Sequence, residues 1–230
     1  MADWWLDETA TAGAEHLDPR YVAGYEAKSG YDPSADLEAL QRLGLGQSSL
    51  VIDLAAGTGG FAIAAAGLCR EVVAVDVSPA MTAVLREKQT ALGLANVRVV
   101  DAGYLSYVHA GDPADFVFCR NALHRVPDFW KGIALRRIHD LLRPGGVLRV
   151  LDLVYDFEPA EADERIAAWL DGATTDPARG FTAAELATHV RTEHSTYTWL
   201  FEALLERAGF AIVDRSTRRS AYATYTARRD

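Results

Sequence analysis

The amino-acid sequence predicts an α/β fold built around a doubly wound parallel sheet. Three observations predict it: apolar strand patterns alternate with helical patterns from Val51 to Leu153, successive strand patterns end in an acidic residue, and a glycine-rich turn follows the first. Such an alternation is typical of a parallel sheet with helices on both faces, which binds ligands beyond the carboxyl ends of its strands. Half of the 230 residues are hydrophobic, enough to bury both faces.

The first of these elements is the strand-to-helix turn at residues 51–61, which reads VIDLAAGTGGF. Such a turn leaves backbone N–H groups unpaired at the positive end of a helix dipole, which makes a cradle for a ligand. Gly57 and Gly59 permit backbone dihedrals closed to other residues and a close approach by the ligand. Asp76 ends the second strand pattern, where a carboxylate can accept hydrogen bonds from ribose hydroxyls. The ligand is therefore expected to contain a ribose.

Two classes of ligand use this device, dinucleotides and S-adenosylmethionine. The dinucleotide pattern G-x-G-x-x-G would fall on Ala55, Gly57 and Gly60, and it would leave Asp53 unexplained. The pattern D-x-G-x-G-x-G begins at Asp53 and ends at Gly59, with Ala55 in place of its first glycine. We favour the second pattern, because a buried carboxylate can reach an amino group but would repel a pyrophosphate.

The landmarks that follow along the chain extend this pattern. They are a third strand at residues 97–101 ending in Asp101, a fourth at 114–119 running into RNALHRVPD, a helix at 133–142, the turn RPGG, and a fifth strand at 147–153. Together they resemble the class I S-adenosylmethionine-dependent methyltransferases, in the branch that acts on small molecules. The resemblance covers about residues 35–153 and the closing strands. The segment after the fourth strand is also similar to ubiquinone and menaquinone C-methyltransferases, from which the long insertion departs.

The resemblance implies a Rossmann-like sheet of seven strands whose last strand is antiparallel. It also implies in-line transfer of a methyl group from S-adenosylmethionine to a small organic acceptor, with release of S-adenosylhomocysteine. The methionine part would lie on Gly57 and Gly59, with its ammonium at Asp53. The ribose would bind Asp76, and the adenine amino edge would meet Asp101. The full set of expected cofactor-binding residues is Asp53, Ala55, Gly57, Gly59, Asp76, Val77, Met81, Asp101, Ala102 and Asn121.

Two histidines are candidate catalytic residues. His124 follows the fourth strand and is either a general base or a structural histidine, and His194 follows the insertion in a polar and aromatic cluster. Tyr21, Tyr25 and His194 are candidate contacts to the acceptor. A zinc site of His189, Glu193 and His194 is conceivable, but neighbouring residues on a helix point in different directions, so we expect no metal.

Composition and charge limit the partners. The formal net charge of −9 argues against nucleic acid, since phosphate neutralisation needs a basic surface. Cys69 and Cys119 lie in apolar settings and are expected to be reduced core residues. The N-terminus lacks the features of a signal peptide and no stretch is long enough to span a membrane, so a cytoplasmic location without membrane attachment is expected. A homodimer is possible.

The expected organisation has two parts. Residues 1–34 form a lid or a segment along the sheet edge, and residues 35–230 form the methyltransferase domain. A helical insertion at 155–195 is either a roof over the substrate or a dimer contact; Thr182 and Glu185 in it match a capping box. Two rival functions stay open: an NAD(P)-dependent oxidoreductase, although a Tyr-x-x-x-Lys pair is missing, and a non-catalytic protein that binds S-adenosylmethionine.

Overall fold

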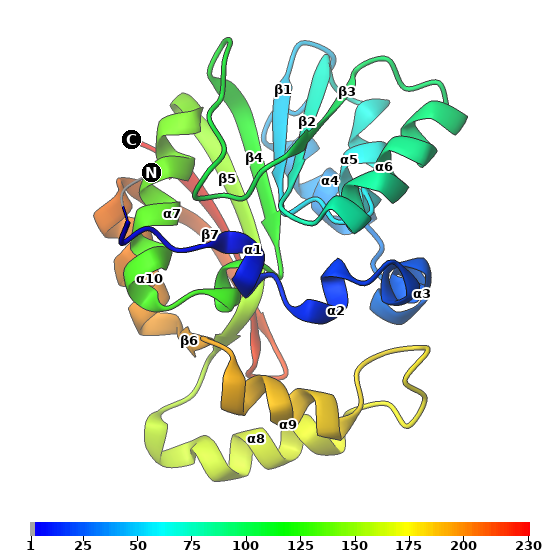
Figure 1. Ribbon diagram of the computed structural model, residues 1–230. Coiled ribbons are helices and arrows are strands. Elements are labelled where there is room, and N and C mark those ends of the chain that lie inside the picture. Colours follow the sequence, from blue (N-terminus) through cyan, green and yellow to red (C-terminus); the bar gives the residue numbers. More distant parts are fainter. Residues whose placement is uncertain (1–2) are drawn as a thin grey trace.

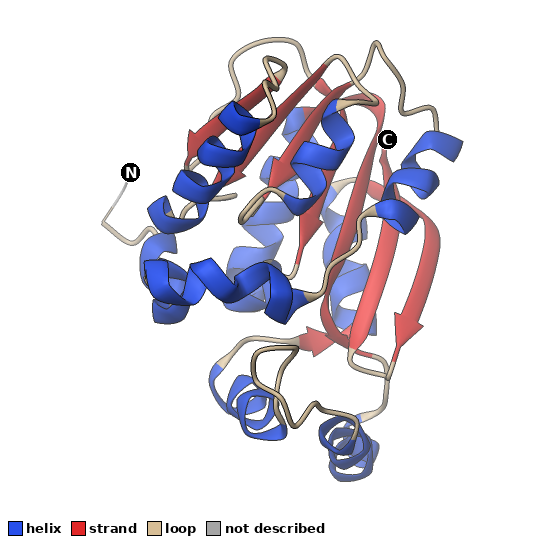
Figure 2. Cartoon of the chain, turned by 90° about the vertical axis from the view of Figure 1, so that its right-hand side faces the viewer, coloured by secondary structure: helices blue, strands red, loops and turns tan. Residues whose placement is uncertain are grey.

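The computed structural model describes residues 3–230 and is built on one mixed sheet with helices on both faces (Figures 1 and 2). The strand order is β3-β2-β1-β4-β5-β8-β7. Strands β1 to β5 are parallel to one another, β8 is antiparallel to β5, and β7 is antiparallel to β8. The predicted Rossmann-like sheet with an antiparallel last strand is thereby confirmed. A short strand, β6, which the sequence did not indicate, also pairs with β5.

The strands follow the predicted apolar segments closely in the first half of the chain. They are β1 (Leu50–Leu54), β2 (Glu71–Asp76), β3 (Val97–Asp101), β4 (Ala114–Arg120), β5 (Leu142–Tyr155), β6 (Thr196–Tyr197), β7 (Phe210–Arg218) and β8 (Tyr222–Arg229). The α-helices are α1 (Glu8–Thr11), α2 (Ala14–Leu17), α3 (Pro19–Ser29), α4 (Ser34–Arg42), α5 (Gly60–Ala66), α6 (Pro79–Ala91), α7 (Asp128–Leu141), α8 (Ala162–Asp171), α9 (Ala183–Thr192) and α10 (Thr198–Ala208). Two 3-10 turns are η1 (Leu123–Arg125) and η2 (Pro159–Glu161).

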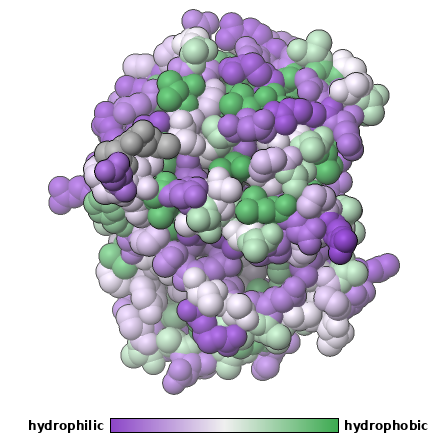
Figure 3. All heavy atoms as spheres, viewed as in Figure 1, coloured by the Kyte–Doolittle hydropathy of each residue, from purple (hydrophilic) through white to green (hydrophobic). Residues whose placement is uncertain are grey.

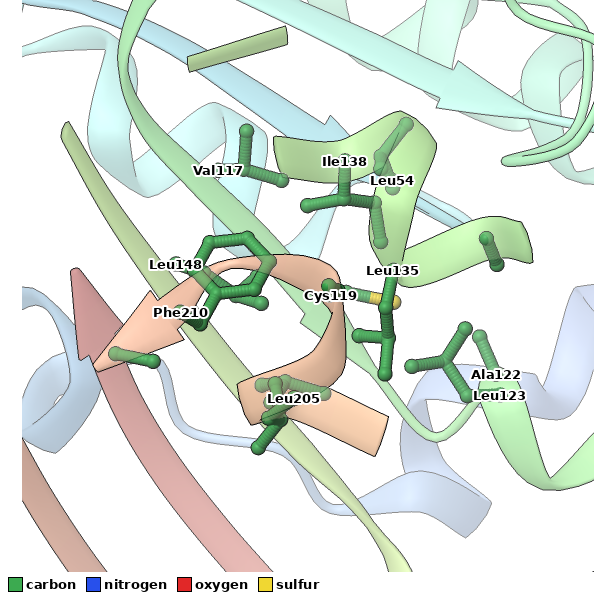
Figure 4. Close-up of a cluster of buried hydrophobic side chains, with 14 of the residues drawn as sticks. Leu54, Val117, Cys119, Ala122, Leu123, Leu135, Ile138, Leu148, Leu205 and Phe210 are labelled. Atoms are coloured by element: carbon green, nitrogen blue, oxygen red, sulfur yellow. The ribbon is translucent and has the colours of Figure 1, made fainter. Parts of the chain in front are cut away.

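The core consists of two apolar layers, one on each face of the sheet. Helices α7 and α10 cover one face, where Leu135, Ile138 and Leu205 pack against strand residues (Figure 4). Helices α4, α5 and α6 cover the other face, where Phe61 stacks on Phe118 of β4 with ring centroids 3.8 Å apart. Burial on both faces explains why β1 and β2 read as continuous apolar runs rather than as alternating patterns.

The carboxyl ends of β1, β2, β3 and β4 meet at one edge of the sheet, beside the N-terminal helices α1 to α3 (Figure 1). The insertion forms helices α8 and α9, which lie beyond this same edge as a separate layer (Figures 1 and 2). Lys28 of α3 contacts the insertion, with its Nζ 2.6 Å from Glu185. The expected capping box of Thr182 and Glu185 is present at the start of α9.

Other parts of the structure bear on the remaining expectations. Cys69 and Cys119 are both buried and unpaired, as expected of core cysteines. No helix within residues 3–230 is both long enough and apolar enough to cross a membrane. Hydrophobic and hydrophilic residues are interspersed over the face shown in Figure 3.

Candidate cofactor site and catalytic residues

A pocket lies at the carboxyl edge of the parallel strands, and the empty space in and in front of it is about 660 Å³. The strand ends, the turn after β1 and the N-terminal helices all contribute to its lining. The structure brings together here seven of the ten residues expected to bind a cofactor: Ala55, Gly57, Asp76, Val77, Met81, Ala102 and Asn121.

Asp76 is the centre of the hydrogen bonding in this pocket. Its Oδ2 accepts a hydrogen bond from the Gly57 N–H at 2.8 Å, and its Oδ1 accepts one from the Ser78 N–H at 2.8 Å. Burial raises the pKa of Asp76, while these backbone donors act in the opposite direction. The carboxylate therefore ties the turn after β1 to the turn after β2, and each of its oxygens keeps acceptor capacity for a ligand.

Two residues that line the pocket adopt a backbone conformation that is rare for residues with a Cβ. Ala55 has a φ of 57° and Asn121 has a φ of 50°. The left-handed region costs a non-glycine residue of order 1–2 kcal/mol, and asparagine tolerates it better than alanine does. The conformation of Ala55 explains why a glycine pattern fits this turn even though the chain carries alanine there. Local strain thus coincides with this pocket.

Asp53 and Gly59 stabilise the turn after β1 and do not line the pocket. Asp53 is 2 % exposed, and its Oδ2 has no hydrogen-bond partner among the described residues. Burial, and next the charge of Asp76, raise the pKa of Asp53 well above its ordinary value. Gly59 caps α5 with a φ of 88°, and a Cβ on it would collide with Leu85 of α6. A direct contact of either residue with a ligand stays a prediction.

The substitution Asp53→Asn should therefore remove a pH-dependent cost of folding. Since the folded pKa lies above the unfolded one, the unmodified protein loses stability as the pH rises above the ordinary aspartate pKa. The variant lacks that loss, so we expect its stability relative to the unmodified protein to increase progressively as the pH rises. Thermal unfolding measured from pH 4 to pH 9 tests this, and parallel curves for the two proteins would contradict it.

The structure does not place the Asp101 carboxylate in the pocket, contrary to the sequence expectation. Its Oδ1 accepts a hydrogen bond from the Thr82 hydroxyl at 2.6 Å, and its Oδ2 accepts one from Arg86 at 2.7 Å. These two contacts lower the pKa of Asp101, with Arg86 the larger cause. The backbone after Asp101 still delivers Ala102 to the pocket lining. The side chain turns away because α6 offers it two donors.

Comparison with known proteins agrees with this geometry. Residues 51–146, which include the turn after β1 and the ends of β2 to β4, match the family described as "Methyltransferase domain". This match assigns residues 51–146 to a methyltransferase domain. The resemblance inferred from the sequence motifs is thereby confirmed.

Relatives of the methyltransferase domain support the same assignment. The chain is 28% identical over 118 residues to a demethylmenaquinone methyltransferase of Geobacillus kaustophilus, a match that covers 50% of each protein, so the chain spans about half the length of this curated relative. A structure of an S-adenosylmethionine-dependent methyltransferase from Aquifex aeolicus superposes with a TM-score of 0.63 at 18% identity, over 92% of this chain and 98% of that one. A magnesium protoporphyrin IX methyltransferase from Synechocystis, solved with bound S-adenosylmethionine, gives 0.66 at 16% identity over 100% of both chains.

The N-terminal helices contribute lining residues to the methyltransferase pocket that the sequence analysis missed. Glu8 of α1 is 7 % exposed; its Oε1 accepts a hydrogen bond from the Leu105 N–H at 2.7 Å, and its Oε2 has no partner among the described residues. Burial raises the pKa of Glu8. The pocket lining also includes His16, which was missed as well, and Tyr25, a candidate acceptor contact from the sequence, whereas Tyr21 is not part of it. Residues 1–34 show no clear periodicity, so no sequence signal placed Glu8 or His16.

Two arginines next to the methyltransferase motifs were also missed. Arg120 ends β4 and lines the pocket, with its guanidinium 4.0 Å from the centroid of the Tyr31 ring. Arg125 lines the pocket as well and lies beside His16, whose pKa is lowered first by burial and then by the charge of Arg125. Both arginines stand in the RNALHR segment, which could have suggested them as cationic neighbours of the site.

The two candidate catalytic histidines lie beside the pocket and are not part of its lining. His124 is buried; its Nδ1 contacts Asp152 and its Nε2 lies 3.1 Å from Oε2 of Glu193. Burial lowers the pKa of His124, but Asp152 and Glu193 outweigh it and the net shift is upward. The His194 N–H donates to the His124 carbonyl at 2.8 Å. Catalytic roles for His124 and His194, and the acceptor contacts of Tyr21, Tyr25 and His194, stay predictions.

Proposed function

We propose that the protein transfers a methyl group from S-adenosylmethionine to a small organic acceptor. The observation that carries this proposal is the pairing of Asp76 with the Gly57 N–H inside a pocket at the carboxyl edge of a methyltransferase domain. The residues present fit the cofactor. The turn after β1 offers a cradle without a side chain at Gly57, Asp76 is a buried acceptor for ribose hydroxyls, and Glu8 holds an unpartnered acceptor oxygen.

Bound in this pocket, the cofactor would supply an electrophilic methyl group on a positively charged sulfur. The chain's own contribution is positioning and exclusion of water, because an in-line displacement needs alignment more than covalent help. Asp76 would orient the ribose, and Val77 and Met81 would flank the adenine ring. Asp53 is buried beside the turn, and a cationic ligand bound near it would favour the charged form of its carboxyl group.

We assign the adenine amino edge to Glu8 in place of Asp101. Glu8 Oε2 is a buried acceptor without a partner among the described residues, and the pocket lining around it includes Ala102 and Gly103. A Cβ on Gly103 would collide with the Glu8 carboxylate, which shows how closely α1 approaches the turn after β3. An exocyclic amino group would satisfy this oxygen.

Glu8→Gln tests this assignment. The amide keeps the shape but offers one acceptor oxygen instead of two, so we expect about a tenfold loss of affinity for S-adenosylhomocysteine by calorimetry. The inosine analogue of S-adenosylhomocysteine, which lacks the amino group, should bind the variant and the unmodified protein with similar affinity. An equal loss for both ligands would contradict a contact between Glu8 and the amino group.

The N-terminal segment and the insertion are proposed to enclose the reaction. Helices α1 to α3 line the cofactor pocket, which supports a lid role for residues 1–34. The insertion at 155–195 contacts α3 through Lys28 and contacts Arg125 of the pocket lining through Glu193, with Arg125 Nη1 3.1 Å from Glu193 Oε1. This position favours a roof over the acceptor rather than a dimer contact.

Where the acceptor must lose a proton, His16 is better placed than His124 to receive it. His16 lines the pocket, and burial and then the charge of Arg125 lower its pKa, which favours the uncharged form that can accept a proton. His124 has charged partners at both ring nitrogens, with Asp152 at one and Glu193 at the other. A group held in this way does not accept a further proton without losing a partner.

Transfer of a labelled methyl group to a panel of small molecules tests the proposed activity. The panel should include hydroquinones, because the curated relative is a demethylmenaquinone methyltransferase, together with phenols, amines and thiols. We expect label in at least one acceptor. Binding of S-adenosylmethionine without any transfer would favour a non-catalytic binding protein, and uptake of NAD(P) instead would favour an oxidoreductase.

A further inference from the structure

A cluster of two histidines and one glutamate joins the insertion to the methyltransferase core. His124 lies in the turn after β4, whereas His189 and Glu193 lie one helical turn apart at the end of α9. Their candidate ligand atoms all lie within 4.8 Å of one another. The side chains are largely buried, with exposed fractions of 4 % for His124, 10 % for His189 and 17 % for Glu193.

Two of the three distances within this cluster are close to the edge of a tetrahedral metal site. Glu193 Oε2 lies 3.1 Å from His124 Nε2 and 3.4 Å from His189 Nδ1. Zinc bonds to imidazole nitrogen of about 2.0–2.1 Å, at tetrahedral angles, place neighbouring ligand atoms about 3.3 Å apart. Oε2 is buried and this close to two ring nitrogens, but neither contact has the alignment of a hydrogen bond. A cation between the carboxylate oxygen and the two imidazoles would satisfy all three groups.

Each of the three side chains also contacts a further group through its other ring nitrogen or carboxylate oxygen. His124 Nδ1 contacts Asp152, and His189 Nε2 lies 2.7 Å from the Ser195 hydroxyl. Arg125 Nη1 lies 3.1 Å from the other carboxylate oxygen of Glu193. Metal-bound histidines typically donate their second nitrogen to such a partner, which fixes the tautomer and turns the lone pair toward the metal. Both histidines can adopt that tautomer here.

We propose that His124, His189 and Glu193 bind a divalent transition-metal ion, with Zn²⁺ the best match. Two imidazoles and one carboxylate suit Zn²⁺, and the set leaves a fourth position for water. The ligands come from two parts of the chain, so the ion joins the insertion to the turn after β4 next to Asn121, Ala122 and Arg125 of the pocket lining. His194, considered as a ligand from the sequence, is outside this set, and its backbone N–H bonds to the His124 carbonyl instead.

The test uses the full chain, stripped with a chelator and titrated with ZnCl₂ alone, with metal content measured by mass spectrometry. We expect one equivalent of zinc per chain. His189→Asn and Glu193→Gln should each weaken the affinity by about 100-fold or more, and Ser195→Ala by about tenfold. His194→Asn is the matched control in the same segment and should change zinc affinity by less than about threefold. The assay is independent of methyl transfer, so its failure would leave the proposed function untouched.

A second measurement covers the case in which a ligand variant does not fold. Co²⁺ added to the unmodified chain should give the visible absorption of a tetrahedral ion, and zinc should abolish it. Circular dichroism of each variant before titration identifies those that can be interpreted. Absence of zinc binding at micromolar concentration would overturn the proposal and leave an ion-paired cluster. Equal zinc binding by the unmodified chain and by folded His189→Asn and Glu193→Gln would overturn it as well, because the ion would then lie elsewhere.

Discussion

Asp76→Ala is expected to weaken the binding of S-adenosylhomocysteine by at least tenfold, or about 1.4 kcal/mol. The carboxylate has two roles that alanine cannot replace. It lines the pocket as an acceptor for the ribose, and it accepts the Gly57 and Ser78 N–H groups at 2.8 Å each, which holds two turns in place. Isothermal titration calorimetry on the folded variant measures the loss.

Asp101→Ala is the control for this experiment, because Asp101 is the neighbouring strand-end carboxylate and its side chain turns to Thr82 and Arg86. We expect its affinity for S-adenosylhomocysteine to fall by less than about threefold. Thermal unfolding of both variants separates a loss of the ligand contact from a loss of the fold. Equal affinities for Asp76→Ala and the unmodified protein would contradict the assignment of Asp76 to the ribose.

Gly59→Ala is expected to lower the free energy of unfolding by about 2–4 kcal/mol. Gly59 has a φ of 88°, in a region that costs a residue with a Cβ of order 1–2 kcal/mol. A Cβ would also lie 3.2 Å from Leu85 Cγ and 3.3 Å from Ile63 Cδ1, in a layer where both helices are packed against the sheet. Overpacking adds to the cost of the backbone strain. Denaturant unfolding of the variant measures the sum.

Gly57→Ala is the matched substitution two residues earlier in the same turn. Gly57 also has a positive φ, of 55°, but a Cβ there would meet Met81 Sδ at 3.9 Å and Tyr25 Cε1 at 4.0 Å, which are ordinary contacts. We expect a smaller loss of stability, about 1 kcal/mol, together with weaker binding of S-adenosylhomocysteine, because Gly57 lines the pocket. If the two variants lost the same stability, the packing role assigned to Gly59 would be wrong.

The sheet was predictable from the sequence because its local signals and its tertiary burial agree. Strands buried on both faces show as unbroken apolar runs, and Asp53 and Asp76 mark the points where two of these runs meet the ligand edge. The glycine turn was also predictable from the sequence, since Gly57 and Gly59 both adopt the positive φ that their spacing suggested. Backbone requirements of this kind are local, so one stretch of sequence reveals them.

The orientation of individual side chains and the contacts between distant segments could not be predicted from the sequence in this way. Whether Asp101 faces the pocket depends on Arg86 of the preceding helix, α6, which donates a hydrogen bond to its carboxylate. Glu8 reaches the pocket only because α1 packs against the turn after β3. The grouping of His124 with His189 likewise depends on how the insertion folds back onto the core. None of these contacts has a periodicity or a spacing that a single sequence could show.

Titration of the unmodified chain with S-adenosylhomocysteine tests the central claim most directly. We predict binding of one ligand per chain, with NAD and NADP giving no heat at the same concentration. Binding of a nicotinamide dinucleotide, with no response to S-adenosylhomocysteine, would contradict the account.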